Sequence, residues 1–213
     1  MAKRCLIIYS SRSGNTTKVA NVFKTTFERN GWLCDIFRVD KRTDPAHPPF
    51  TIKDYDFVCA GTGLFMHEPY SEITTVIRWQ IYGADPWELA RLGPERAPVR
   101  PLDVHRRIVL GPESKKALVF ATYAGYEFGP KEAKPALELL ALEIEHLEFQ
   151  CIGQFCCPGR YLANPTPHTY HGDIRKRPNE QDLLKAEMFI EEKLEEIANR
   201  SAGATKRAAS AGL

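Results

Sequence analysis

The sequence has no long hydrophobic run. Across its 213 residues, no stretch approaches the roughly 18 consecutive apolar residues that a membrane-spanning helix needs. The apolar run at residues 5–9 directly follows the first four residues, and it is too short for the core of a signal peptide; no cleavage site follows it. We therefore expect neither a membrane span nor a secretory leader.

The cysteines lack the spacing of metal-binding or redox motifs. None of the six cysteines forms a C-x-x-C pair, and no spacing matches a zinc or iron–sulfur site. Cys5, Cys34, Cys59 and Cys151 lie in apolar runs, where a buried free thiol is the usual state. Free thiols are typical of a reducing compartment, so we expect a cytoplasmic protein without a metal site.

The sequence also lacks a strong excess of charge of one sign. The net charge is +2, the isoelectric point is near 8.2, and no basic cluster is long enough to cover one face of an element. Nucleic acid is therefore not an expected partner. With 43% hydrophobic and 26% charged residues, the composition is typical of a globular domain, and the length fits one domain with or without an insertion.

Short apolar runs alternate with amphipathic patterns along the chain. The predicted strands are residues 5–9, 33–39, 56–60, 117–121 and 149–154, and the clearest predicted helices are 16–29, about 130–147, and 180–198. Continuous apolar strands separated by helices indicate a parallel sheet covered on both faces. We therefore expect an α/β, three-layer, doubly wound sheet of five parallel strands in the order 2-1-3-4-5.

Two segments lie outside this plan. Residues of about 80–116 are rich in proline and arginine and are predicted to form an insertion with one short helix at 86–92. The insertion is either a partner or substrate surface or a solvated loop that covers the edge of the sheet. The tail at 199–213 is small, polar and non-periodic, so we expect residues 1–198 to form the domain and the tail to be disordered.

The stretch after the first strand, SSRSGNTT at 10–17, is rich in hydrogen-bond donors. Ser11, Ser13, Asn15 and Thr16 offer side-chain donors, and Gly14 allows a close approach of the backbone. The start of the following helix adds unpaired N–H groups and partial positive charge, so the loop predicts a phosphate site. No lysine follows the glycine as in a P-loop, and the spacing does not match G-x-G-x-x-G. A serine- and threonine-rich helix cap without a ligand is the alternative.

The segment IIYSSRSGNT at 7–16 resembles the flavodoxin signature of two apolar residues, an aromatic residue and x-[ST]-x-x-G-x-T. The segment RPNEQDL at 177–183 is similar to a pattern found before the last helix in a broader flavodoxin-like family, and the resemblance covers about 3–77 and 117–198. It implies that FMN is the cofactor and that the loop holds its phosphate. The residues so assigned are Ser11, Arg12, Ser13, Gly14, Asn15 and Thr16. The side chain of Arg12 either faces solvent or partly neutralises the phosphate.

Two more loops are expected at the same edge of the sheet, CAGTGLFMHEPY at 59–70 and FATYAGYEFGP at 120–130. The resemblance implies that they pass the two sides of the flavin ring, and that a peptide beside Gly61 or Gly63 can reorient. The residues so assigned are Thr62, Gly63, Leu64 and Phe65 in the first loop and Thr122, Tyr123, Ala124, Gly125 and Tyr126 in the second. Ordinary strand-to-helix turns with core aromatic residues are the alternative.

The resemblance leaves three functions open. The first is an FMN-binding electron carrier between redox partner proteins. The second is an NAD(P)H-dependent FMN oxidoreductase that acts on a small-molecule acceptor such as a quinone, and the third is a flavin-free interaction module that uses residues 80–116. Electron-transfer flavodoxins are usually strongly acidic, so the net charge of +2 weakens the first alternative. No catalytic residue is assigned.

Overall fold

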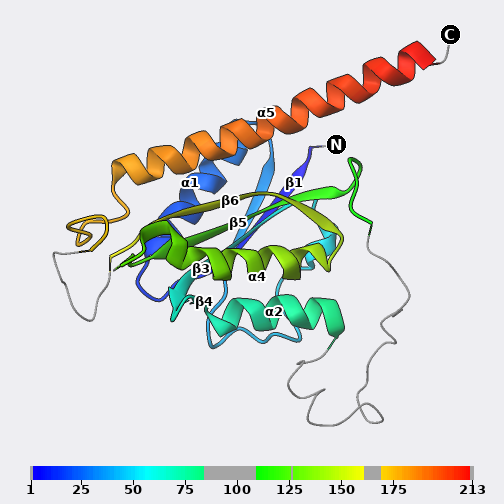
Figure 1. The fold of residues 1–213 in the computed structure, drawn as a ribbon. Helices are drawn as coiled ribbons and strands as arrows, with labels where there is room; N and C mark the ends of the chain where they lie inside the picture. The colour runs from blue at the N-terminus through cyan, green and yellow to red at the C-terminus, as the bar shows by residue number, and fades with distance from the viewer. Residues whose placement is uncertain (1, 84–108, 126, 161–168, 212–213) are drawn as a thin grey trace.

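A computed structural model describes residues 2–83, 109–125, 127–160 and 169–211, and for 201–211 it describes the backbone alone. Its centre is a parallel sheet in the order β2-β1-β3-β5-β6 (Figure 1). The strands are β1 (Arg4–Ser10), β2 (Leu33–Arg38), β3 (Phe57–Phe65), β5 (Lys115–Tyr123) and β6 (Phe149–Pro158). This order confirms the expected fold class. Within the described residues there is one additional strand, the two-residue β4 (Glu68–Pro69), which pairs antiparallel with the end of β3.

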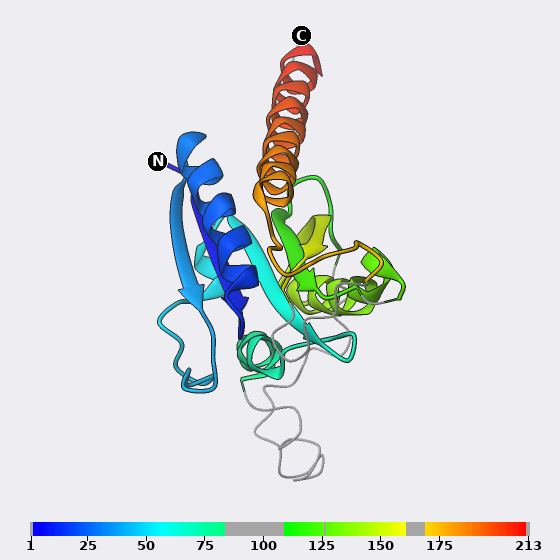
Figure 2. The same cartoon turned by 90° about the vertical axis from the view of Figure 1, so that its left-hand side faces the viewer.

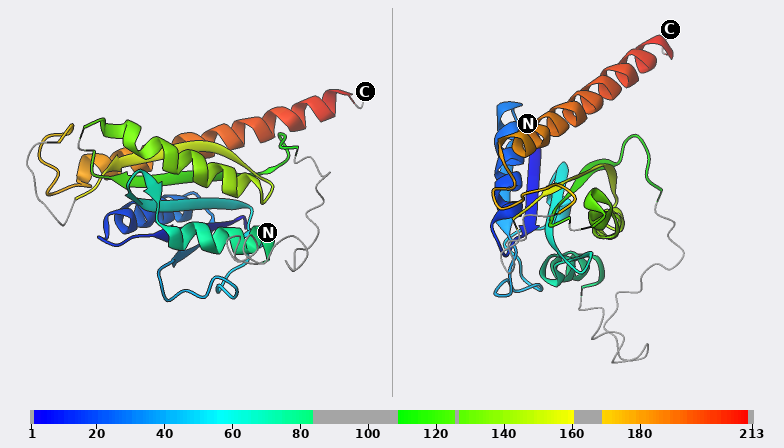
Figure 3. Two further views of the ribbon diagram at one scale, coloured as in Figure 1. Left: turned by 60° about the horizontal axis from the view of Figure 1, so that its bottom comes forward. Right: turned by 60° about the vertical axis from the view of Figure 1, so that its left-hand side comes forward.

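Two pairs of helices cover the sheet. Helices α1 (Asn15–Arg29) and α5 (Glu180–Ala211) lie on one face, whereas α2 (Ser71–Tyr82) and α4 (Lys134–Glu145) lie on the other (Figures 2 and 3). Short 3₁₀ helices, η1 (Ile52–Asp54) and η2 (Gly129–Ala133), precede β3 and α4. The three expected layers are therefore present. Within the described residues, no helix is both long and apolar enough to cross a membrane.

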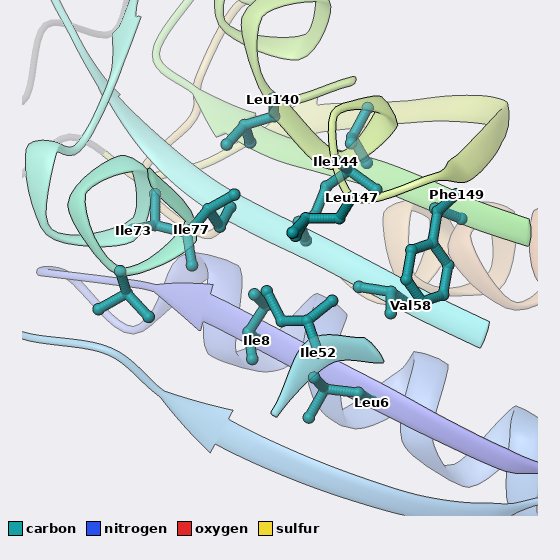
Figure 4. Packing of buried hydrophobic residues seen from close by; sticks show 14 of the residues in the cluster. Leu6, Ile8, Ile52, Val58, Ile73, Ile77, Leu140, Ile144, Leu147 and Phe149 are labelled. Atoms are coloured by element: carbon teal, nitrogen blue, oxygen red, sulfur yellow. The ribbon is translucent and has the colours of Figure 1, made fainter. Parts of the chain in front are cut away.

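The continuous apolar runs of the strands are explained by burial on both faces. Leu6 and Ile8 of β1 point toward α2 and α4, where they pack with residues such as Ile73 and Leu140 (Figure 4). Ile7, on the same strand, belongs to the core under α1 and α5. A strand buried on both faces cannot alternate between apolar and polar residues, and β1 does not.

The segment at 177–183 forms the start of α5. The backbone N–H of Asn179 donates to Asp182 Oδ2 at 2.9 Å, and the N–H of Asp182 donates to Asn179 Oδ1 at 3.1 Å. This reciprocal arrangement is a capping box. Arg177 also forms an ion pair with Asp182, whose residue exposure is only 2%. The pattern RPNEQDL therefore encodes a helix start on the face of the sheet opposite α4.

Two expectations about element boundaries differ from the structure. We expected disorder from residue 199, whereas α5 continues to Ala211 and projects beyond the sheet (Figures 1 and 2). The alanines that made this segment look non-periodic also have the highest helix propensity. Strand β3 was expected to end at residue 60, but it continues to Phe65. Residues 61–63 pair in parallel with β5, and Leu64 and Phe65 pair with β4.

The expected insertion at 80–116 overlaps the end of α2 and the start of β5. Its residues 84–108, including the helix expected at 86–92 and the arginines, lie outside the described residues. The described residues before this gap end at Gly83, after α2, and those after it begin at Val109, before β5. Since α2 runs antiparallel to the strands, both points lie toward the amino edge of the sheet, away from the loops predicted to bind a ligand.

Candidate cofactor site at the carboxyl edge of the sheet

A cavity of about 480 Å³ lies where the loops after β1, β3 and β5 meet. Its size is within the range of small-molecule and cofactor sites. Ten of the residues predicted from the sequence line it: Arg12, Ser13, Asn15 and Thr16 from the first loop, Gly63, Leu64 and Phe65 from the second, and Thr122, Tyr123 and Ala124 from the third. The topology therefore brings the three predicted loops around one space.

Helix α1 begins beside this cavity without a side-chain cap. Gly14 precedes the helix in the left-handed region, with φ at 82°, and no side chain bonds to the N–H groups of the first turn. These groups have no intrahelical partners, and the helix dipole concentrates partial positive charge around them. The serines and threonines of the loop therefore do not cap the helix as the alternative expected.

Ser11 precedes the first residue of α1 by four positions, does not itself line the cavity, and has an unpaired hydroxyl. The residue is 3% exposed, and Ser11 Oγ is the one buried side-chain nitrogen or oxygen without a hydrogen-bond partner in the described parts of the chain. A buried polar atom without a partner costs about 1–3 kcal/mol. Such atoms are rare, and an absent ligand is a standard explanation.

Asn15 and Thr16 have partners within the protein. Asn15 Nδ2 donates to the carbonyl of Arg160 at 2.8 Å, and Thr16 Oγ1 lies 2.9 Å from Thr122 Oγ1. A Cβ on Gly159 would lie 2.6 Å from Asn15 Nδ2, so Gly159 allows this approach. These contacts join the first loop to the ends of β5 and β6. Their assignment as phosphate ligands stays a prediction.

Arg12 is half exposed to solvent and also pairs with a carboxylate from a distant part of the chain. Its Nη2 donates to Glu72 Oε1 at 3.0 Å, and its guanidinium lies 4.1 Å from the centre of the Tyr70 ring. Glu72 is in the first turn of α2, 60 residues further along the chain. Tyr70 also lines the cavity, although the sequence analysis did not assign it to the site.

The predicted loop after β3 is in large part a hairpin. Gly61 and Gly63 lie in β3, and neither has a positive φ. A Cβ on Gly61 would lie 2.1 Å from the Phe120 ring, and one on Gly63 would lie 2.6 Å from the Tyr70 ring. Close ring contacts therefore account for both glycines. The reorientation of a peptide, which the resemblance implied, stays untested.

The tip of this hairpin is strained. Met66 and His67 have φ values of 51° and 68°, a conformation that two-residue hairpin turns require and that Asn-Gly adopts most easily. Non-glycine residues there cost roughly 1–2 kcal/mol each. Phe65 and Met66 are nonetheless 61% and 80% exposed beside the cavity.

We expect the double change Met66→Asn with His67→Gly to raise the free energy of unfolding by about 1 kcal/mol, because it relieves strain at both positions. Urea unfolding would measure the gain. The change of both residues to alanine is the matched control, since it removes the same side chains and keeps the strained conformation. A gain no larger than that of the control would show that the turn is not strained.

The third loop contains a tyrosine–histidine pair. Tyr123 Oη lies 2.9 Å from His171 Nε2, and Gly125, with φ at 67°, packs against both rings. Burial raises the pKa of Tyr123 and lowers the pKa of His171, so the phenol and the imidazole are both uncharged at neutral pH. Tyr126, also predicted to contact the flavin, lies outside the described residues.

Four described residues that were predicted for the site do not line the cavity: Ser11, Gly14, Thr62 and Gly125. Thr62 Oγ1 accepts the N–H of Tyr70 at 2.9 Å and donates to the carbonyl of Gly63 at 2.6 Å. The sequence analysis missed several lining residues: Met66, His67, Tyr70, Glu132, Gly159 and Arg160. Met66, His67 and Tyr70 stand in the loop quoted at 59–70. Their thioether, imidazole and phenol groups were the signal that could have identified them as lining residues. Gly159 and Arg160 follow β6, which was expected to end at residue 154.

Metal ligands and reactive thiols are not found around the cavity. In the described ranges, no group of three or more histidine, cysteine, aspartate or glutamate side chains is arranged to hold a metal ion. All six cysteines are free. Burial raises the pKa of Cys156 to about 11 and also raises that of Cys157, so both remain thiols at neutral pH.

Comparisons with known proteins agree with this architecture. No protein-family model and no curated protein sequence matches the chain. The structure is similar to that of oxidised flavodoxin 1 from Bacillus cereus, with a TM-score of 0.55 and 13% identity over 91% of this chain and 98% of that one. It is also similar to a flavodoxin, WrbA-like protein from Agrobacterium tumefaciens, with a TM-score of 0.50 and 14% identity over 89% and 93% of the two chains.

A third similar structure is rubredoxin oxygen:oxidoreductase from Desulfovibrio gigas. Its TM-score is 0.56 at 12% identity, and the match covers 93% of this chain but only 37% of the larger enzyme. At such identities the comparisons establish the fold. With the strand order and the position of the cavity, they show that the chain has the flavodoxin-like fold.

Proposed function

We propose that the protein binds one FMN non-covalently in this cavity and carries electrons between redox partners. The observation that carries the proposal is the unpaired, buried Ser11 Oγ beside the uncapped start of α1. A phosphate is a ligand that would accept hydrogen bonds from both.

The donor set fits a phosphate that is held without a cation. Arg12 already has Glu72 as its partner, so its positive charge is largely compensated. The phosphate would be held by Ser11, by the N–H groups of the first turn of α1 and by its dipole. Asn15 and Thr16 would keep the surrounding loops in place through Arg160 and Thr122.

The rest of the cavity fits a planar ring. Gly63, Leu64 and Tyr70 line the cavity from β3 and the hairpin that follows, and Thr122 and Ala124 line it from the end of β5. When bound, FMN would supply the redox chemistry, and the protein would contribute its position and its surroundings. Phe65 and Met66 are exposed at the mouth and would exclude water from the ring or contact a partner.

The proposal is tested by incubating the purified protein with FMN, desalting it and recording its visible absorption. We expect the flavin bands to remain with the protein, and riboflavin to be retained less well because it lacks the phosphate. Flavin in the flow-through only would overturn the proposal and would favour the flavin-free interaction module.

A second candidate is an NAD(P)H-dependent FMN oxidoreductase. It is favoured by the net charge of +2, which differs from that of strongly acidic electron carriers. Oxidation of NAD(P)H by the FMN-loaded protein with a quinone as acceptor would separate the two candidates, with free FMN at the same concentration as the control. Turnover above that control would favour the enzyme.

A further inference from the structure

Arg12, Tyr70 and Glu72 form one cluster at the wall of the cavity. Arg12 Nη2 donates to Glu72 Oε1 at 3.0 Å and Oε2 at 3.3 Å. The Glu72 side chain is only 9% exposed, whereas that of Arg12 is 48% exposed. Removal of Arg12 from this carboxylate would leave a largely buried charge without its partner, which is costly. The ion pair therefore keeps the Arg12 guanidinium on Glu72.

The same guanidinium positions the Tyr70 ring. It lies 4.1 Å from the ring centre, within the distance of a favourable cation–π contact. Two further contacts restrict the tyrosine: its N–H donates to Thr62 Oγ1 at 2.9 Å, and its ring occupies space beside Gly63 that a Cβ would fill. Tyr70 is thereby held as a planar wall of the cavity.

We propose that Arg12 is a positioning residue that sets the affinity for the flavin ring through Tyr70, and that it is not the counter-ion of the phosphate. The identity of the ligand rests on the proposed function, whereas the role of Arg12 rests on the contacts with Tyr70 and Glu72. Arginine suits this role because its planar guanidinium can stack on a ring and pair with a carboxylate at once. Burial raises the pKa of Tyr70, while the charge of Arg12 opposes that rise.

The chain contains a matched cluster at the other end of β1. Arg4 lies 4.5 Å from the centre of the Tyr55 ring and pairs with Asp35 at 3.0 Å. None of these three residues lines the cavity. Arg4→Gln therefore removes the same charge and the same kind of ring contact as Arg12→Gln, but away from the site.

The test compares the dissociation constants of FMN and riboflavin for the wild type, Arg12→Gln and Arg4→Gln. Riboflavin carries the same ring without the phosphate. We expect Arg12→Gln to raise both constants by a similar factor, on the order of fivefold, and Arg4→Gln to change neither. Weaker binding of FMN with unchanged riboflavin would identify Arg12 as the counter-ion and overturn the proposal.

Two further measurements keep the test decisive. Because Arg12→Gln leaves Glu72 unpaired, the double variant Arg12→Gln with Glu72→Gln removes both charges, and it should show the same parallel loss if the single variant is unstable. NMR of ring-labelled tyrosine in the flavin-free protein, assigned with Tyr70→Phe, reports on Tyr70 directly. We expect Arg12→Gln to raise the pKa of Tyr70 and Arg4→Gln to leave it unchanged.

The NMR measurement also distinguishes the two proposals. If the wild type retains no flavin, the proposed function fails, and the Tyr70 titration still decides whether Arg12 contacts the ring. If the wild type binds FMN but the pKa of Tyr70 does not respond to Arg12→Gln, the positioning role fails alone.

Discussion

Ser11→Ala is expected to stabilise the flavin-free protein and to weaken its binding of FMN. In the absence of a ligand, Ser11 Oγ is buried without a partner, so its removal takes away an unfavourable group and leaves only a small gap. We expect a gain of about 1 kcal/mol in the free energy of unfolding, at the lower end of the cost of an unsatisfied buried group. Urea unfolding without FMN would measure it.

With FMN present the sign of the effect reverses. A hydrogen bond to a charged group contributes about 1.5–3 kcal/mol, so Ser11→Ala should raise the dissociation constant of FMN by roughly tenfold or more. Riboflavin should be affected far less, because it offers no phosphate to this hydroxyl. The two effects together would place a ligand oxygen beside Ser11.

Ser13→Ala is the matched control, since Ser13 belongs to the same loop, lines the cavity and is only partly buried. We expect no gain in stability from it. A loss of stability in flavin-free Ser11→Ala, or an unchanged affinity for FMN, would contradict the assignment of Ser11 and remove the observation on which the proposed function rests.

Gly61→Ala is expected to destabilise the fold by roughly 3 kcal/mol, at the upper end of the usual cost of overpacking. The added Cβ would lie 2.1–2.5 Å from three atoms of the Phe120 ring. That ring is fully buried and already packs against Phe23, with 4.8 Å between the ring centres. Gly61 is paired with Phe120 on the neighbouring strand, so neither backbone can retreat without breaking the sheet.

Thermal and chemical unfolding would measure this loss. Gly111→Ala is the control, because a Cβ there meets nothing within 4 Å and the residue has no positive φ. The second-site change Phe120→Leu should recover part of the loss in Gly61→Ala, since neighbouring changes that relieve one clash are not additive. A loss in Gly61→Ala equal to that of the control would show that the sheet has room at this position.

The features that could be predicted from the sequence are those set by residues close together in the chain. The strands of the sheet were visible as apolar runs, and their alternation with helices was enough for the order 2-1-3-4-5. The loop at 10–17 was predicted as an anion site from its donors, its glycine and the following helix, and Ser13, Asn15 and Thr16 of this loop line the cavity.

Features that depend on contacts far apart in the sequence could not be predicted. Nothing in the segment near Arg12 indicates that Glu72 and Tyr70 pair with it. The last two residues of β3 depended on β4, which folds back on residues that looked like a loop. The capping box at Asn179 and Asp182 gives a structural reason for the RPNEQDL pattern, because both of its hydrogen bonds lie at the start of α5.

The sequence by itself determined the parallel sheet, the position of the three loops at its carboxyl edge and the donors of the first loop. These follow from apolar periodicity and from side-chain chemistry, which act over a few residues. Only the tertiary structure decided that Ser11 is the donor left unpaired and that Arg12 contacts the Tyr70 ring. It also decided that Gly61 and Gly63 leave space for the rings of Phe120 and Tyr70. Those outcomes depend on which side chains compete for the same space and the same partners, and that competition exists only after strands and loops from distant parts of the chain have packed together.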